Sequence, residues 1–158
     1  MTEIRIIEQD PALPACCELV EAHWFEMGEL YGDTGPCLFR PSDVNGPGAV
    51  FLAAYEGLNA IGCGALRQMV RDDVLSPGEA EVKRVYVRPS HRNRGIARQI
   101  MKTLEALAPS MGYKVLTLET GSLQPFAVRL YRNMGYSDSD PFGEYIDDPR
   151  SVFLSKTL

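Results

Sequence analysis

Histidine and cysteine are scarce in this sequence, and long apolar runs are missing. The two histidines and four cysteines form no Cys-x-x-Cys pair and show no spacing typical of metal ligands, so we expect no metal site. No segment approaches the ~18 consecutive apolar residues of a membrane-spanning helix, so we expect no membrane contact. Segment 1–5 lacks the charged and apolar parts of a signal peptide, which predicts a cytoplasmic protein with reduced thiols.

The sequence also lacks residues and motifs that several classes of enzyme need. With only His23 and His91 available, a Ser-His or Cys-His nucleophile has few parts to use. Neither Ser-x-x-Lys nor Gly-x-Ser-x-Gly occurs. The length predicts a single domain over residues 1–158, and the hydrophobic fraction of 45% is enough to build a full core.

One basic segment stands out because the chain as a whole is acidic, with a net charge of −5. A positive island on an acidic chain favours a small polyanion as the ligand and disfavours a nucleic acid. Between Val82 and Arg98 no acidic residue occurs, and the basic residues are Lys83, Arg84, Arg88, Arg92, Arg94 and Arg98.

The island contains the segment Arg92-Asn93-Arg94-Gly95-Ile96-Ala97, which lies between an expected strand and an expected helix. The first N–H groups of a helix have no intrahelical partner, and the helix dipole adds about half a positive charge there. Gly95 has no Cβ, so the backbone can approach a ligand closely. The segment therefore predicts a site for a phosphorylated ligand.

The hydrophobic periodicity predicts the order β-α-loop-β-β-β-α-β-α-β. Three consecutive strands imply antiparallel hairpins, and the strand–helix–strand step from Ala80 to Leu118 implies a parallel, right-handed crossover. We therefore expect an α/β fold with a mixed sheet and helices on its faces. The expected strands are Ile4–Ile7, Val50–Tyr55, Ala60–Met69, Ala80–Val87, Val115–Leu118 and Ser151–Lys156; the expected helices run from Asp10 to Gly28 or Gly32, from Gly95 to about Leu107 and from Pro125 to Met134; a polar turn is expected over Arg71–Gly78, and a loop with a possible short helix at Pro41–Val44 over Gly32–Gly48.

These residues resemble the GNAT superfamily of N-acetyltransferases. Its cofactor signature, Gln/Arg-x-x-Gly-x-Gly/Ala, matches residues 92–97, with Arg in place of the commoner Gln and Ala in place of the commoner last Gly. About thirty residues on, segment 124–136 resembles the family pattern Asn-x-x-Ala-x-x-Leu-Tyr-x-x-x-Gly-Phe, with Gln124 in place of Asn. A bacterial subgroup with Leu-Glu-Thr-Gly (118–121) and Pro-Phe-Gly-x-Tyr (141–145) is also similar. The signature alone is weak evidence, but its combination with the second block is specific.

The resemblance implies a single-domain fold with a mostly antiparallel sheet of six to seven strands, splayed between the fourth and fifth strands. It also implies acetyl-CoA as co-substrate: the loop binds the pyrophosphate, and the strand before it pairs with the pantetheine arm. Arg88, Arg94 and Arg98 are alternatives for the 3′-phosphate. The cofactor-binding residues implied are Val85, Tyr86, Val87, Arg92, Asn93, Arg94, Gly95, Ile96, Ala97, Gln124 and Ala127.

The resemblance further implies direct attack of an amine on the thioester. Glu81 lies where several family members carry a catalytic glutamate, and we expect it to be the general base, directly or through a water. Glu119 is the rival, and a structural role for Glu81, paired with Lys83 or Arg84, is the alternative. Tyr131 matches the tyrosine that gives a proton to the CoA thiolate, although a purely packing role is possible.

The sequence says least about the acceptor substrate. A small or peptidic primary amine is expected, with Tyr31, Glu119, Phe142 and Tyr145 as candidate binding residues. Family habit suggests a homodimer. Two other classes remain open: a non-catalytic acyl-CoA-binding or regulatory module, which the presence of both candidate catalytic residues disfavours, and a nucleic-acid binder, which the acidic net charge disfavours.

Overall fold

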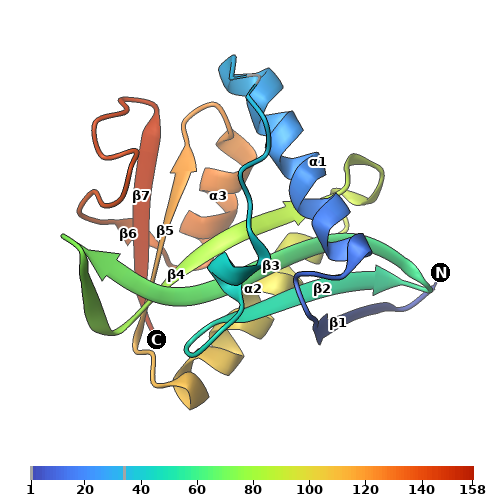
Figure 1. Cartoon of the computed structure of the whole chain (residues 1–158), viewed down its shortest axis with the longest axis horizontal. Coiled ribbons are helices and arrows are strands. Elements are labelled where there is room, and N and C mark those ends of the chain that lie inside the picture. Colours follow the sequence, from blue (N-terminus) through green and yellow to red (C-terminus); the bar gives the residue numbers. More distant parts are fainter. Residues whose placement is uncertain (1, 34) are drawn as a thin grey trace.

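A seven-stranded mixed sheet organises the computed structural model, which describes residues 2–33 and 35–158 (Figure 1). Met1 and Thr34, which belong to the expected N-terminal segment and loop, lie outside the described residues. The strand order is β1-β2-β3-β4-β5-β7-β6, and only the pairing of β4 with β5 is parallel. The strands are β1 (Ile4–Glu8), β2 (Val50–Glu56), β3 (Asn59–Arg71), β4 (Val74–Val87), β5 (Val115–Gly121), β6 (Ser137–Asp138) and β7 (Ser151–Thr157).

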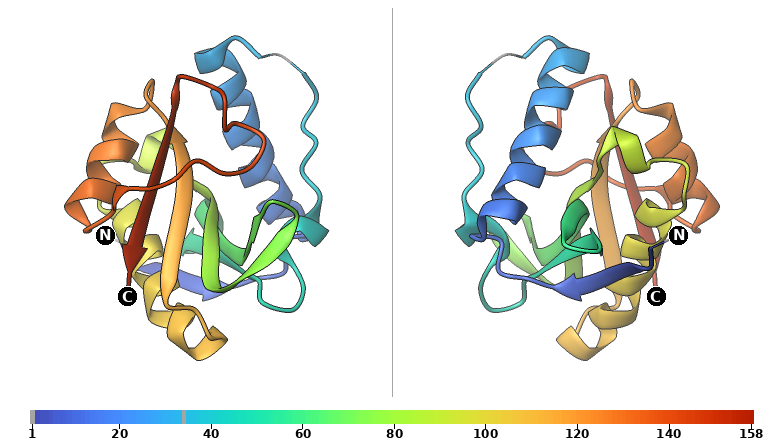
Figure 2. Two further views of the ribbon diagram at one scale, coloured as in Figure 1. Left: turned by 90° about the vertical axis from the view of Figure 1, so that its left-hand side faces the viewer. Right: turned by 90° about the vertical axis from the view of Figure 1, so that its right-hand side faces the viewer.

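Helices cover both faces of this sheet, as the two views in Figure 2 show. On one face α2 and α3 pack over the larger core cluster, and on the other face α1 packs over a smaller one. No helix in the described part of the chain is long and apolar enough to span a membrane. The helices are α1 (Pro14–Tyr31), α2 (Ile96–Leu107) and α3 (Pro125–Asn133), with 3-10 turns at η1 (Pro41–Val44), η2 (Pro89–His91) and η3 (Ala108–Met111).

Helix α2 lies close to the sheet because β3 has glycines beneath it. Ile100 and Leu104 are fully buried on the apolar face of α2. A Cβ on Gly64 would stand 2.6 Å from the Ile100 side chain, well inside contact distance. The close packing fixes where α2 begins, and with it the loop that precedes α2.

Most expected elements are confirmed within a few residues, including the short helix at Pro41–Val44 and the mixed sheet. The expected polar turn over Arg71–Gly78 is wrong: β3 and β4 continue through most of it and meet at Asp72 and Asp73, whose φ angles are 50° and 62°. Aspartate tolerates this left-handed backbone better than most residues. The short strand β6 was also not expected.

The parallel pairing of β4 with β5 is short. It joins Glu79–Glu81 to Val115–Thr117 and then ends, although β4 continues to Val87 and β5 to Gly121. A bulge in the β3–β4 ladder follows directly, between the pairs Cys63↔Tyr86 and Ala65↔Lys83. The expected splay between the fourth and fifth strands is therefore confirmed.

Candidate active site

The segment from Asn93 to Arg98, which leads into α2, presents a row of backbone N–H groups without backbone partners. In the described chain, no backbone carbonyl accepts a hydrogen bond from the N–H groups of residues 93–98, and the first bond of α2 runs from Gln99 to Gly95 at 3.0 Å. Gly95 has a φ of 74°, and a Cβ built on it meets no atom within 4 Å, so space lies open in front of the loop. Asn93 also has a positive φ, 63°, a backbone conformation that asparagine adopts more readily than most residues.

The arginine side chains of this loop are compensated within the chain. Arg92 donates to Glu26 at 2.6 Å, and Arg94 donates to Glu56 at 2.7 Å. The hydrogen bond from Arg92 is the main reason that the pKa of Glu26 is lowered. The positive island of the sequence is thus partly neutralised in the fold, and the loop offers an anion mainly backbone N–H groups.

Past the end of the β4–β5 pairing, residues 82–87 have no partner on their β5 side. The side chains of Val85 and Val87 pack against the core beneath α2. Tyr86 packs on the opposite face, where the Arg92 guanidinium lies 5.6 Å from its ring centre. This free edge of β4 leads, through the η2 turn, to the N–H groups of the loop.

The two carboxylates of β4 are tightly bound. Glu81, which is buried, accepts hydrogen bonds from Arg67, the shortest being 2.9 Å, and has Lys83 Nζ at 3.6 Å. Burial acts to raise the pKa of Glu79, but hydrogen bonds from Arg71, Thr117 and Ser76 outweigh it and lower the pKa to about 2.

Glu119 on β5 has a different environment. Its Oε1 accepts a hydrogen bond from Ser151 Oγ at 2.9 Å, and no cation of the described residues forms an ion pair with it. Burial raises the pKa of Glu119 to about 6, although the Ser151 hydrogen bond and the charge of Lys83 act to lower it. The carboxylate therefore changes its protonation state close to neutral pH.

Tyr131 lies on the other face of the sheet, on α3. Its ring is buried in the core beneath α2 and α3, edge-on to Tyr136 with 5.9 Å between the ring centres. Burial raises the pKa of its hydroxyl, which keeps the phenol protonated at neutral pH. No hydrogen bond to this hydroxyl occurs among the described residues. Ala127, on the same helix, packs against this core.

The candidate acceptor residues are only partly gathered. Tyr31 ends α1, and its hydroxyl accepts a hydrogen bond from Gln124 at 3.2 Å. The Tyr31 hydroxyl occupies the space that a Cβ on residue 121 would fill. Because Gly121 has no Cβ, the end of α1 can contact the end of β5. Tyr145 is 47% exposed, whereas Phe142 is buried in a separate cluster with Met69 and Phe153.

Other residues of this region were not singled out from the sequence. Arg84 is expected from the sequence only as part of the basic island and as an alternative partner of Glu81, yet it occupies the bulge with a φ of 59°, and Glu81 pairs with Arg67 and Lys83. Arg67, the partner of Glu81, and Ser151, the partner of Glu119, carry no motif. Only the three-dimensional arrangement reveals these pairs.

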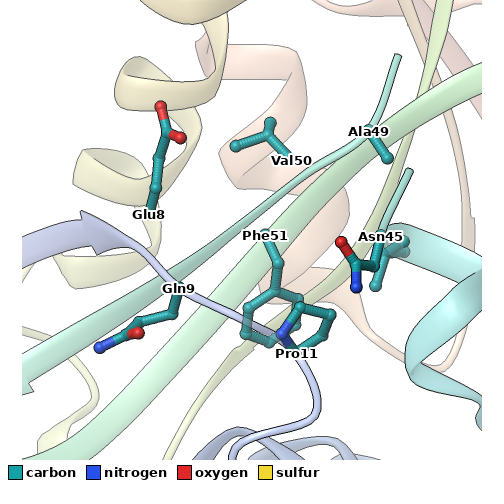
Figure 3. A pocket seen from close by; sticks show the side chains of 8 residues that line it. Glu8, Gln9, Pro11, Asn45, Ala49, Val50 and Phe51 are labelled. Atoms are coloured by element: carbon teal, nitrogen blue, oxygen red, sulfur yellow. The ribbon is translucent and has the colours of Figure 1, made fainter. Parts of the chain in front are cut away.

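A small hollow lies elsewhere, at the β1 edge of the sheet (Figure 3). It has a volume of about 150 Å³ and no basic lining residue, so it does not suit a large polyanion. In the part of the chain that the structure describes, no three His, Cys, Asp or Glu residues are placed to hold a metal ion. The hollow is lined by Glu8, Gln9, Pro11, Val44, Asn45, Ala49, Val50 and Phe51.

The family model of the GNAT acetyltransferases matches residues 16–136, from the first turn of α1 to Tyr136, which follows α3. The chain belongs to this family. The IAA acetyltransferase of Azospirillum brasilense is 33% identical over 158 residues, which cover 100% of both chains.

Solved structures agree with this assignment. A Klebsiella pneumoniae protein assigned to the acyl-CoA N-acyltransferases has a TM-score of 0.77 and 30% identity, with 98% of this chain and 97% of that chain covered. A GNAT acetyltransferase from Elizabethkingia anophelis, solved with acetyl-CoA bound, shares the fold with a TM-score of 0.66 at 19% identity, with 98% of each chain covered. This GNAT chain is an N-acetyltransferase with acetyl-CoA as its donor.

Proposed function

We propose that this chain, acting as one domain, transfers the acetyl group of acetyl-CoA to a primary amine by direct attack in a ternary complex. The observation that carries the proposal is the end of the β4–β5 pairing at Glu81. It leaves one edge of β4 free, directly before the loop whose N–H groups have no backbone partner. A long donor with an amide-rich arm and a pyrophosphate needs both features in that order.

The donor would bind mainly through the backbone. The N–H groups of residues 93–97 suit the pyrophosphate, and the edge at Val85 to Val87 suits the pantetheine amides. A free N–H near Val87 would polarise the thioester carbonyl and stabilise the developing oxyanion. Because Gln124 already donates to Tyr31, its contact with the donor requires it to turn from that partner.

Glu119 is the better-supported general base of the two carboxylates. An acceptor amine arrives as an ammonium ion, so the base must be free to take a proton near neutral pH. The pKa of Glu119 is raised to about 6 by burial, and a serine is its hydrogen-bond partner. Glu81 instead accepts hydrogen bonds from the Arg67 guanidinium, which fits a role in fixing the strands.

Tyr131 is the proposed acid, and its position on the opposite face of the sheet from Glu119 suits this division of labour. The ammonium loses one proton to Glu119, and the amine nitrogen then forms a bond to the thioester carbon. The C–S bond breaks as the tetrahedral intermediate collapses. Tyr131 gives its proton to the thiolate and recovers one from the attacking nitrogen, so that one proton is released overall.

The test is a thiol-release assay with acetyl-CoA and a panel of amines, amino acids and peptides. We expect turnover with at least one acceptor, a strong reduction in Tyr131→Phe, and a stronger one in Glu119→Gln than in Glu81→Gln. Calorimetric binding of acetyl-CoA without turnover across the panel would favour the binding module. Absence of acetyl-CoA binding would contradict the proposal as a whole.

A further inference from the structure

Arg84 is a half-buried cation without an anion. It lies on the bulge of β4, just past the end of the β4–β5 pairing, and its φ of 59° is uncommon for a residue with a side chain. Its guanidinium stacks 5.3 Å from the centre of the Phe39 ring. Among the described residues no carboxylate pairs with it and no acceptor takes a hydrogen bond from it.

Each neighbouring cation has a carboxylate partner. Lys83 and Arg67 share Glu81, which leaves a net charge of +1 on the three groups, and Arg92 is paired with Glu26. Arg84 is therefore the one cation of this group that has no carboxylate partner among the described residues. Its carbonyl oxygen accepts a hydrogen bond from Cys63 Sγ at 3.1 Å, which holds the bulge in place.

A second unsatisfied group lies close by. The Nδ1 atom of His23 is buried without any hydrogen-bond partner, and the imidazole stacks on Tyr86 with 5.3 Å between ring centres. Burial and, after it, the charge of Arg84 lower the pKa of His23 to about 4, so the ring is neutral near pH 7 and lies within the field of the guanidinium. With its proton on Nδ1, a neutral imidazole can donate to an anion.

Charges of both signs lie near Tyr145. Burial and then the charges of Glu144 and Glu119 raise the pKa of its hydroxyl, while the charge of Arg84 acts to lower it. A ligand near Tyr145 therefore meets carboxylates as well as the Arg84 guanidinium. Such an arrangement suits a zwitterion.

We propose that the acceptor is an amino acid, whose carboxylate binds the Arg84 guanidinium and the Nδ1–H group of His23 while its amine faces Glu119. The proposal rests on the acetyl transfer proposed above and names its substrate class. A carboxylate fits better than a phosphate, because its single negative charge is offset by one guanidinium. A dianionic phosphate would meet Glu119 and Glu144, and Arg84 is the one cation there without a carboxylate partner of its own.

The first experiment compares acceptors that differ only in the carboxylate. Phenylalanine, phenylalaninamide and 2-phenylethylamine, with the matching leucine and methionine sets, are assayed for thiol release at saturating acetyl-CoA. We expect kcat/KM to be at least about tenfold higher for the amino acid than for its amide or amine, because the latter leave Arg84 unpaired. Equal or higher kcat/KM for the carboxylate-free amines would overturn the proposal and leave acetyl transfer intact.

The second experiment removes the guanidinium without straining the bulge. Arg84→Asn is chosen because asparagine tolerates a positive φ. We expect KM for the amino acid to rise about 10- to 100-fold, with KM for acetyl-CoA unchanged and the preference over the amine lost. His23→Phe, which keeps the stacking on Tyr86, should raise the same KM by a smaller factor. Arg132→Gln, in an exposed ion pair with Asp138, is the control and should change none of these values.

A binding measurement keeps the proposal testable if no acceptor in the panel is turned over. Phenylacetate and phenylacetamide, which have no amine, are titrated calorimetrically into the protein saturated with CoA. We expect only the carboxylate to bind, and its binding to be lost in Arg84→Asn. Equal affinity for both compounds, or unchanged affinity in the variant, contradicts the amino-acid proposal. Failure of CoA itself to bind contradicts the acetyltransferase proposal instead.

Discussion

The proposed donor loop and the proposed acceptor side of this molecule leave different kinds of groups unsatisfied. At the loop, Arg92 and Arg94 are neutralised by Glu26 and Glu56, and the groups left without backbone partners are backbone N–H groups. On the acceptor side the unpaired groups are side chains, namely the Arg84 guanidinium and the Nδ1 atom of His23.

This difference teaches why the two sites are not equally visible in a sequence. Binding a ligand through backbone N–H groups requires a particular backbone conformation, and glycine at a fixed spacing indicates that conformation in the sequence. Side-chain recognition can use residues from any element that the fold brings together. Four substitutions test the contrast, beginning with the largest expected effect.

Replacing Glu119 by Gln should lower kcat by about 10²- to 10⁴-fold, because the amine then keeps its proton. In the unmodified enzyme, kcat/KM should rise with pH through about 6 as Glu119 loses its proton, and this limb should disappear in the variant. Rate measurements between pH 5 and 8 check both points. Glu81→Gln is the matched variant, and a larger loss of kcat there would assign the base to Glu81.

Replacing Gly95 by Val should weaken acetyl-CoA binding by about 100-fold or more, because a β-branched residue resists a φ of 74° and its side chain would shield the N–H groups. Gly57→Val is a close control, since Gly57 has a φ of 60° and also has open space around it, but it lies in the β2–β3 turn. Both variants should lose similar stability by thermal melting. A calorimetric Kd unchanged in Gly95→Val would argue against the loop as the donor site.

Replacing Glu79 by Gln should cost about 2 kcal/mol of stability at pH 7, which is less than the full difference between a pKa of about 2 in the fold and 4.5 in the unfolded chain because the carboxylate is partly exposed. Because the folded-state pKa is lowered, this contribution is present above pH 4.5 and is lost as the pH falls towards 2. Urea unfolding from pH 7 to pH 3 should show a shallower decline in the variant. A parallel decline in both proteins would contradict the assigned role.

As the pH falls from 7 to 4, the free energy of unfolding should decline by about 2 kcal/mol less in His23→Phe than in the unmodified protein. This value is smaller than the full pKa shift would give, because the ring is not wholly enclosed. Since the pKa is lowered from 6.5 to about 4, His23 destabilises the fold as the pH falls through this window. The charges acting on it are those of Arg84, Glu26 and Arg92.

The comparison for this last variant is the difference in unfolding free energy between the two proteins at each pH. Glu119 titrates in an overlapping window with the opposite sign, because its raised pKa contributes stability below pH 4.5 that is lost as the pH rises through about 6. That contribution cancels in the difference. A difference that stays constant from pH 7 to pH 4 would show that His23 is solvated.

The sequence predicts the loop and helix of the proposed donor site well, because their signals are local. Ile96, Ile100 and Leu104 repeat at helical spacing, and Gly95 precedes them, so α2 and its loop are confirmed almost to the residue. Arg67 meets Glu81 only through the register of a hairpin whose strands are longer than expected. His23 and Arg84 come together only when α1 packs on the sheet, and no pattern along the chain encodes that contact.

The bulge at Arg84 also reverses the alternation of β4. Before it, Ala80 and Val82 point into the core beneath α2; after it, Val85 and Val87 do so, and Tyr86 faces α1. The apolar spacing of two therefore changes once to a spacing of three. Deleting residue 84 would turn the last strand segment inside out, placing a tyrosine in the main core and two valines against α1. The strand thus requires one extra residue at this point to keep its later side chains on the correct faces, and that residue is Arg84.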